Sequence, residues 1–130
     1  MGMRLLLDTQ AFLWWVTDDD RLSTAARASI GASDTQVFVS AASAWEIITK
    51  VRIGRLPLDG PVDGFIARQL EENAFQPLSI TMRHTFELEA LPDLHRDPFD
   101  RMLIAQALAE DMPLVTGDLA IRAYPISTIW

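Results

Sequence analysis

The sequence predicts an α/β fold in which helices cover both faces of a parallel sheet of four or five strands. Short apolar or β-branched runs alternate with helical patterns along the whole chain. Because parallel strands need crossover connections, this alternation favours a parallel sheet with helices between its strands. The chain has 130 residues, which is the size of one ordinary domain. We therefore expect a single domain over residues 1–130, built as a three-layer α/β/α sandwich.

The first half of the chain is expected to hold two strands and three helices. Residues 4–8 form a short apolar run typical of a buried strand, and residues 9–18 have a helical pattern. A second helix is expected over residues 24–32. Residues 35–40 are β-branched and aromatic, which favours a strand, and residues 41–54 follow as an amphipathic helix. The residues expected to start or stop these helices are Ser23, Ser40 and Gly54.

The second half is expected to add three helices and three strands. A helix within residues 58–74 has Pro61 at its start, and its apolar residues are spaced for one helical face. Thr81 is expected to cap a helix over residues 82–91, and the last long helix covers residues 98–111. The expected strands are residues 75–80, 112–118 and 125–130.

Composition and charge exclude several classes of protein. The sequence has no run of about 18 apolar residues that would span a membrane, and the apolar run near its start is too short for a signal peptide. The absence of cysteine excludes disulfides, thiol catalysis and cysteine-ligated zinc, and fits a cytoplasmic protein. The net charge of −7 argues against non-specific binding of nucleic acid. However, the cations are arginines except Lys50, and arginine suits bidentate binding of phosphate.

Four acidic residues are expected at one edge of the sheet. Parallel sheets bind ligands beyond the carboxyl ends of their strands. Asp8 ends the first strand, Asp118 follows the fourth, and Glu46 lies about two turns into the helix after the second. Asp100 reaches the same edge if its helix starts nearby. Carboxylates this close would repel each other without a cation, and a set of oxygen ligands favours Mg²⁺ or Mn²⁺ over zinc.

Each acid also has a structural interpretation, which the local sequence leaves open. Asp8 and Asp118 could cap the helical segments that follow them, and Glu46 could face solvent from its amphipathic helix. Asp97 fits an N-cap, with a proline at the first helical position and Asp100 at the third.

The aromatic and histidine residues are expected to have structural roles. His84 and His95 are expected to be packing or surface residues rather than bases. Trp14 and Trp15 are adjacent and cannot share one helix face, so one is expected in the core and the other at an interface.

Four segments follow one another along the chain: LLLDT, VSAASAWEI, HRDPFDRMLIAQA and LVTGD. Together and in this order they resemble the PIN-domain ribonucleases, and more closely the toxin component of VapBC toxin–antitoxin pairs. The resemblance extends from Met3 to the terminal STIW. It implies a small α/β/α sandwich whose acidic residues bind one or two Mg²⁺ or Mn²⁺ ions and cleave single-stranded RNA. It also implies an antitoxin partner that blocks the site, and a homodimer.

The resemblance assigns roles to individual residues. The family acids fall on Asp8, Glu46, Asp100 and Asp118. Thr9 and Thr116 match hydroxyl residues beside them, and Asp97 has a capping or supporting role. Gln10 departs from the family, whose members frequently have histidine there, although we expect metal binding to persist. The metal would activate a water and stabilise charge on the scissile phosphate. Arg96 and Arg101 could each contact RNA phosphate, pair with a site acid, or lie on the surface.

Other classes of function fit the sequence less well. A phosphoacceptor receiver domain needs paired acids after the first strand and a late lysine, but Asp8 is single and Lys50 lies in mid-chain. A phosphatase of the haloacid dehalogenase type needs two acids two residues apart after that strand. A non-catalytic interaction module remains compatible with the paired tryptophans and apolar helices. The sequence leaves open the RNA target, the cognate antitoxin and the number of metal ions.

Overall fold

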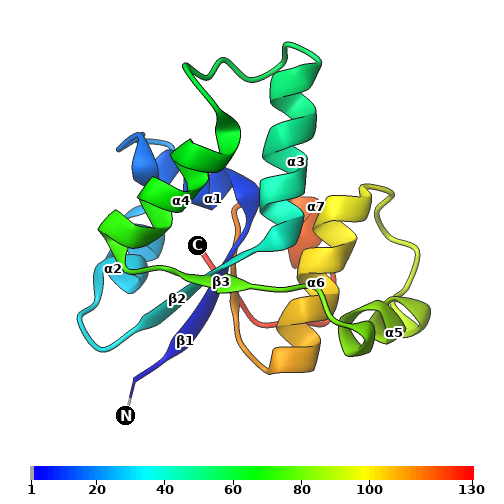
Figure 1. Cartoon of the computed structure of the whole chain (residues 1–130). Coiled ribbons are helices and arrows are strands. Elements are labelled where there is room, and N and C mark those ends of the chain that lie inside the picture. Colours follow the sequence, from blue (N-terminus) through cyan, green and yellow to red (C-terminus); the bar gives the residue numbers. More distant parts are fainter. Residues whose placement is uncertain (1) are drawn as a thin grey trace.

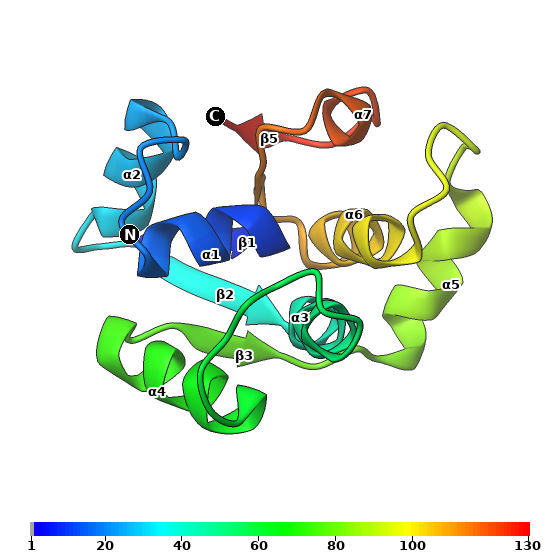
Figure 2. The ribbon, with the colours of Figure 1, turned by 90° about the horizontal axis from the view of Figure 1, so that it is seen from above.

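The strands of the protein form one parallel sheet, which Figure 1 and Figure 2 show from two directions. The structure is a computed structural model and describes residues 2–130. Within these residues the strands are β1 (Arg4–Leu7), β2 (Gln36–Ser40), β3 (Gln76–Leu78), β4 (Leu114–Val115) and β5 (Thr128–Ile129). The helices are α1 (Thr9–Val16), α2 (Thr24–Gly31), α3 (Ala41–Arg52), α4 (Val62–Asn73), α5 (Met82–Ala90), α6 (Pro98–Glu110) and α7 (Leu119–Arg122).

The strand order is β3-β2-β1-β4-β5, and every neighbouring pair is parallel. β1 lies at the centre, with Leu6 opposite Phe38 of β2 on one side and Leu114 of β4 on the other. The carboxyl ends of all five strands therefore meet at one edge of the sheet. This arrangement confirms the predicted parallel sheet.

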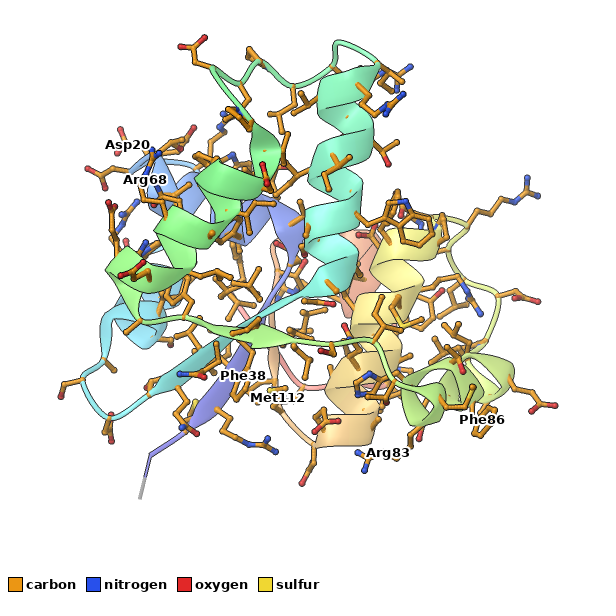
Figure 3. All side chains as sticks on the ribbon, viewed as in Figure 1. Asp20, Phe38, Arg68, Arg83, Phe86 and Met112 are labelled. Atoms are coloured by element: carbon orange, nitrogen blue, oxygen red, sulfur yellow. The ribbon has the colours of Figure 1, made fainter. Side chains whose placement is uncertain are left out.

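Helices cover both faces of this sheet, because successive side chains of a strand point to opposite faces. Leu5 and Leu7 pack into a core with α1, α2 and α4, and Leu6 packs into a second core with α6. Phe38 and Met112 belong to the second core and are labelled in Figure 3. Two cores separated by a sheet confirm the predicted α/β/α sandwich.

The predicted helix starts are largely confirmed. Four of the helices begin after a residue whose side chain accepts a hydrogen bond from the backbone of the first turn, as the sequence indicated: Ser23, Ser40, Thr81 and Asp97. Gly54 lies just past the end of α3 with a φ of 75°, a left-handed conformation that suits a residue without a side chain. Pro61 precedes α4 as its N-cap, without a side-chain hydrogen bond.

The last three predicted strands are shorter than expected, and the first of them, predicted over residues 75–80, is β3 at Gln76–Leu78. The segment 112–118 has strand geometry only at Leu114–Val115, because Pro113 lacks a backbone N–H and Thr116 begins the turn that leads to α7. The prediction for the paired tryptophans is also corrected, since Trp14 and Trp15 are both half-buried and neither is enclosed in the core. None of the helices in residues 2–130 has the length and hydrophobicity of a transmembrane span.

Candidate active site

One pocket, of about 630 Å³, lies at the carboxyl edge of the sheet. Its walls come from α1, α3, α6 and the turn after β4. The carboxylates that line it are those of Asp8, Glu46, Asp97, Asp100 and Asp118. The structure thus brings together the four acids that the sequence predicted at this edge, and adds Asp97 to them.

Asp8 is held in place by the junction between β1 and α1. It is the N-cap of α1, and its Oδ1 accepts a hydrogen bond of 2.7 Å from the Ala11 N–H. Its own N–H donates to the carbonyl oxygen of Val115 in β4, at 3.1 Å. These bonds fix the carboxylate of Asp8 at the boundary between two neighbouring strands.

Glu46 is buried rather than facing solvent, with only 5% of its surface exposed. Thr9 Oγ1 lies 2.7 Å from Glu46 Oε1 and 2.9 Å from Ser43 Oγ. A hydroxyl has one hydrogen, so Thr9 donates to the carboxylate and accepts from Ser43. Lys50, one helical turn further along α3, pairs with Glu46 Oε2 at 2.5 Å. Thr9 and Lys50 therefore set the position of the Glu46 carboxylate, and the solvent-facing interpretation is wrong.

The first turn of α6 carries two of the acids. Asp97 Oδ1 accepts hydrogen bonds from the N–H groups of Phe99 and Asp100, which confirms Asp97 as the N-cap. Asp100 Oδ2 lies 2.8 Å from His95 Nε2, and both side chains are mostly buried. The sequence analysis placed Asp100 at the edge of the sheet on the condition that its helix starts nearby. This condition is met, because α6 begins at Pro98.

The turn after β4 places Asp118 in the wall of the pocket. Thr116 is fully buried, and its Oγ1 accepts a hydrogen bond of 3.1 Å from the Asp118 N–H. Asp118 Oδ1 in turn accepts from the Ala120 N–H at 2.9 Å and caps α7. Thr116 therefore shapes the turn that presents Asp118, and it also forms a hydrogen bond with Asp8.

Two of these carboxyl groups have raised pKa values. Burial raises the pKa of Asp8 to about 6, and the negative charges of Asp100 and Asp118 add to the rise, against the hydrogen bonds from Thr116 and Ala11. Burial also raises the pKa of Asp100 to about 6, helped by Asp97 and Glu46 and opposed by His95. Desolvation and mutual repulsion are the conditions under which a bound cation is most favourable to a carboxylate cluster.

The acid set fits a hard divalent cation. Its donor atoms are carboxylate oxygens, which are the ligands that Mg²⁺ and Mn²⁺ prefer. Among the described residues, the possible ligand atoms of His95, Asp97 and Asp100 all lie within 4.8 Å of one another. Asp8, Glu46 and Asp118 line the same pocket but stand outside this tight group. Asp100 is the acid that belongs both to this group and to the set predicted from the sequence.

The two arginines that the sequence singled out have different surroundings. The Arg101 guanidinium donates to the Pro92 carbonyl oxygen and to the Tyr124 hydroxyl, and it lies 3.8 Å from Asp93. These contacts tie the loop before α6 to the helix, and none of them involves a site acid. Arg96 is exposed and lines a smaller surface pocket beside His95.

Sequence reasoning missed several residues of the pocket. His95 was expected to be a packing or surface residue, and nothing in its spacing from Asp100 predicted their contact. Lys50 follows Glu46 by four residues, and this helical spacing could have indicated the pair. The other residues that the sequence did not assign to the site are Gln10, Trp14, Arg21, Gly117 and Trp130.

The fold and the pocket define a class of protein: a small α/β/α domain with a cluster of acids at the carboxyl edge of a parallel sheet. The family model described as "PIN domain" matches residues 5–126, and the chain therefore belongs to the PIN-domain family. Ribonuclease VapC22 from Mycobacterium tuberculosis is 32% identical over 131 residues, a match that covers 97% of this chain and 98% of that protein. These matches confirm the family predicted from the sequence.

Solved structures support the same fold. The crystal structure of VapBC2 from Rickettsia felis bound to a DNA fragment contains a chain that matches this one with a TM-score of 0.71 at 14% identity, over 97% of both chains. The crystal structure of FitAcB from Neisseria gonorrhoeae contains a chain that matches with a TM-score of 0.57 at 17% identity, over 95% of both chains. At these identities the likeness concerns the fold alone.

Proposed function

We propose that this protein is a Mg²⁺- or Mn²⁺-dependent endoribonuclease that cleaves single-stranded RNA and acts as the toxin of a toxin–antitoxin pair. The observation that carries the proposal is the gathering of five carboxylates, from the starts of α1, α6 and α7 and from α3, into one pocket of a PIN domain. The 32% identity to a ribonuclease supports RNA as the substrate. Membership of the PIN-domain family favours this activity over the receiver-domain and phosphatase classes.

The proposed metal ligands are Asp8, Glu46, Asp100 and Asp118, with Asp97 in support. A divalent cation held by these carboxylates would polarise the scissile phosphodiester and favour attack by water. The chain itself supplies the positions of the ligands. Backbone N–H groups fix three of the acids, Thr9 fixes the Glu46 carboxylate, and His95 fixes the Asp100 carboxylate.

Lys50 also brings a positive charge to this pocket. Its ammonium group pairs with Glu46 and remains 43% exposed, so a positive charge lies beside the acids at the pocket wall. We expect this charge to reduce the repulsion between the acidic pocket and an approaching RNA phosphate.

The proposed partners are RNA, a cognate antitoxin protein and a second copy of the chain. An apolar surface beside the pocket is formed by Trp45 of α3, 59% exposed, which packs edge-on against Phe99 of α6 at 4.9 Å between ring centroids. The antitoxin and the homodimer both remain predictions. Size-exclusion chromatography with light scattering, on the chain alone and on the chain expressed with the protein encoded beside its gene, would measure both.

Cleavage of a labelled single-stranded RNA tests the activity. We expect cleavage with Mg²⁺ or Mn²⁺, none with EDTA, and a loss of at least about 100-fold in Asp8→Asn and Asp100→Asn, which remove charge without changing shape. Glu89→Gln, an exposed acid of α5 outside the pocket, is the matched control and should cleave like the wild type. Circular dichroism checks that all three variants keep the fold. Full activity in both aspartate variants would contradict the proposal.

A further inference from the structure

The wall of the pocket next to Asp118 is aromatic. Trp14 of α1 and Trp130 pack against each other with ring centroids 5.9 Å apart and planes tilted by 49°. The guanidinium carbon of Arg21 lies 5.0 Å from the centre of the Trp14 ring. Figure 2 shows the end of the chain just past β5, at the edge of the sheet. We call Trp14, Arg21 and Trp130 the tryptophan wall.

This wall is adjacent to the acids. Trp130 lies directly against Gly117, because a Cβ atom added at Gly117 would stand 2.5 Å from Cε2 of Trp130. Gly117 is the residue before Asp118, so the absence of a side chain there lets the indole approach the turn that carries the acid. Trp130, Gly117 and Asp118 line the same pocket.

The tryptophans of the wall differ from the other two tryptophans of the chain. Trp15 and Trp45 do not line the pocket, and Trp15 donates its indole N–H to Asn73 at 3.0 Å. The indole N–H of Trp14 is buried and has no hydrogen-bond partner among the described residues. Buried donors in proteins are nearly always satisfied, so this N–H suits an ordered water.

Electrostatics alone would not hold RNA in this pocket. Five carboxylates line it, and the net charge of the chain is −7, so the pocket repels phosphate. Aromatic side chains bind single-stranded nucleic acid by stacking on the bases, which does not depend on the protein's net charge, and arginine adds a cation that contacts both base and phosphate. Arg21 is 69% exposed and lines the pocket, and its guanidinium pairs with Asp19 at 2.7 Å, so contact with a phosphate requires it to share or exchange that partner.

We propose that the tryptophan wall is a nucleobase subsite, in which a base of single-stranded RNA stacks beside the acids while Arg21 contacts its backbone. The subsite positions the neighbouring phosphate over the carboxylates. This inference rests on the proposed ribonuclease function, since it names the part of the substrate that the same pocket recognises.

Binding of a fluorescein-labelled single-stranded RNA of about ten nucleotides measures the subsite. The Asp100→Asn background separates binding from cleavage. We expect Trp130→Leu and Trp14→Leu to weaken binding about 5-fold to 100-fold, the range that stacking of one base supports, and the phenylalanine variants to retain part of it. Phe86→Leu removes an exposed aromatic side chain of α5 outside the pocket and should bind like the background.

Arg21→Gln tests the same wall with a substitution at an exposed site that leaves the core intact. We expect weaker RNA binding and a smaller dependence of affinity on salt, because one phosphate contact is lost. Arg68→Gln, an exposed arginine of α4 labelled in Figure 3, is the matched control and should change neither. This variant keeps the inference testable even if a leucine substitution unfolds the protein.

Cleavage of RNAs that carry one abasic position each closes the test. With the wild type, we expect cleavage to slow at one position next to the cut, and with Trp130→Leu the same abasic position should cause no further loss. If the wild type cleaves RNA but the wall variants behave like their controls, the subsite is wrong and the ribonuclease function stands. If the wild type cleaves no RNA with either metal, the proposed function itself fails.

Discussion

At the scale of single residues, three of the pocket acids are helix N-caps and also line the pocket. Asp8, Asp97 and Asp118 each use Oδ1 to accept a backbone N–H at the start of a helix. A carboxylate has two oxygens, so a cap occupied at one oxygen leaves the other for a ligand. The interpretations that the sequence left open, helix cap or site residue, are therefore compatible. The cap fixes the direction in which the acid points.

Asp97 separates these two roles experimentally. Asparagine caps helices about as well as aspartate, so Asp97→Asn should keep the stability of the protein, while Asp97→Ala should lower it by about 1 kcal/mol. If Asp97 only caps α6, the asparagine variant should also keep most of the RNA cleavage. Thermal unfolding and cleavage rates, measured on the same two variants, give both results. A severe loss of cleavage in Asp97→Asn would instead make Asp97 a metal ligand.

The raised pKa of Asp8 predicts how the stability of the metal-free protein depends on pH. Because the pKa of Asp8 is about 6 in the folded protein and 3.8 in its ordinary state, the folded state binds more protons between these values. Its contribution to stability is therefore fully present below pH about 4 and is lost as pH rises through about 6.

Asp8→Asn should remove this dependence. The variant should gain stability relative to the wild type as pH rises from about 4 to about 7, in EDTA, although it loses the metal-dependent activity. Urea unfolding of both proteins at several pH values measures the difference. A difference that stays constant with pH would show that Asp8 has no raised pKa. The comparison with the wild type cancels the contribution of Glu110, whose pKa His84 lowers and which changes stability in the opposite direction.

At the scale of elements, the position of α6 depends on its contact with α5. His84 of α5 is fully buried. The Thr81 N–H donates to its Nδ1 at 3.0 Å, so the proton lies on Nε2, which donates to Glu110 of α6 at 2.7 Å. Arg83 also contacts Glu110, and Figure 3 shows its side chain at the carboxyl end of α6. One histidine therefore caps α5 and ties it to the helix that carries Asp100.

Replacing this histidine should destabilise the protein. His84→Ala removes the reciprocal cap of α5 and leaves Gln106 and Glu110 without their partner, at a cost of about 2–4 kcal/mol. Met82→Ala, in the same turn but 70% exposed, should cost less than about 1 kcal/mol. Chemical denaturation of the two variants measures the free energies of unfolding. Equal values for both variants would show that His84 does not connect α5 to α6.

At the scale of the whole molecule, the pocket acids come from elements spread through the sequence and meet only in the folded chain. A cation that binds them therefore binds the folded state and not the unfolded one. We expect Mg²⁺ or Mn²⁺ to raise the melting temperature, with a stabilisation of about 2.7 kcal/mol when the free metal is about 100 times its dissociation constant. Differential scanning calorimetry with metal and with EDTA measures this stabilisation.

The site variants give the control for this prediction. Asp100→Asn should lose most of the metal-induced rise in melting temperature, while Glu89→Gln should keep it. An equal rise in both variants would mean that the metal binds elsewhere on the protein.

The sequence by itself determined the features that depend on near neighbours along the chain. The apolar run of β1, the β-branched run of β2 and the capping residues of α2, α3, α5 and α6 are local signals, and each was found where predicted. The rule that ligands bind at the carboxyl edge of a parallel sheet then predicted that four acids lie close together: Asp8, Glu46, Asp100 and Asp118. The resemblance to the PIN-domain family supplied their proposed roles.

Only the tertiary structure decided which side chains touch. The contact of His95 with Asp100 depends on how the loop before α6 folds back, and the packing of Trp130 on Trp14 depends on β5 joining the edge of the sheet beside β4. β4 also pairs with β1, which lies more than 100 residues away in the sequence, so its place in the sheet is set by a distant segment. These contacts join residues brought together by the fold of the whole chain, and a local pattern of residues does not predict how distant segments pack.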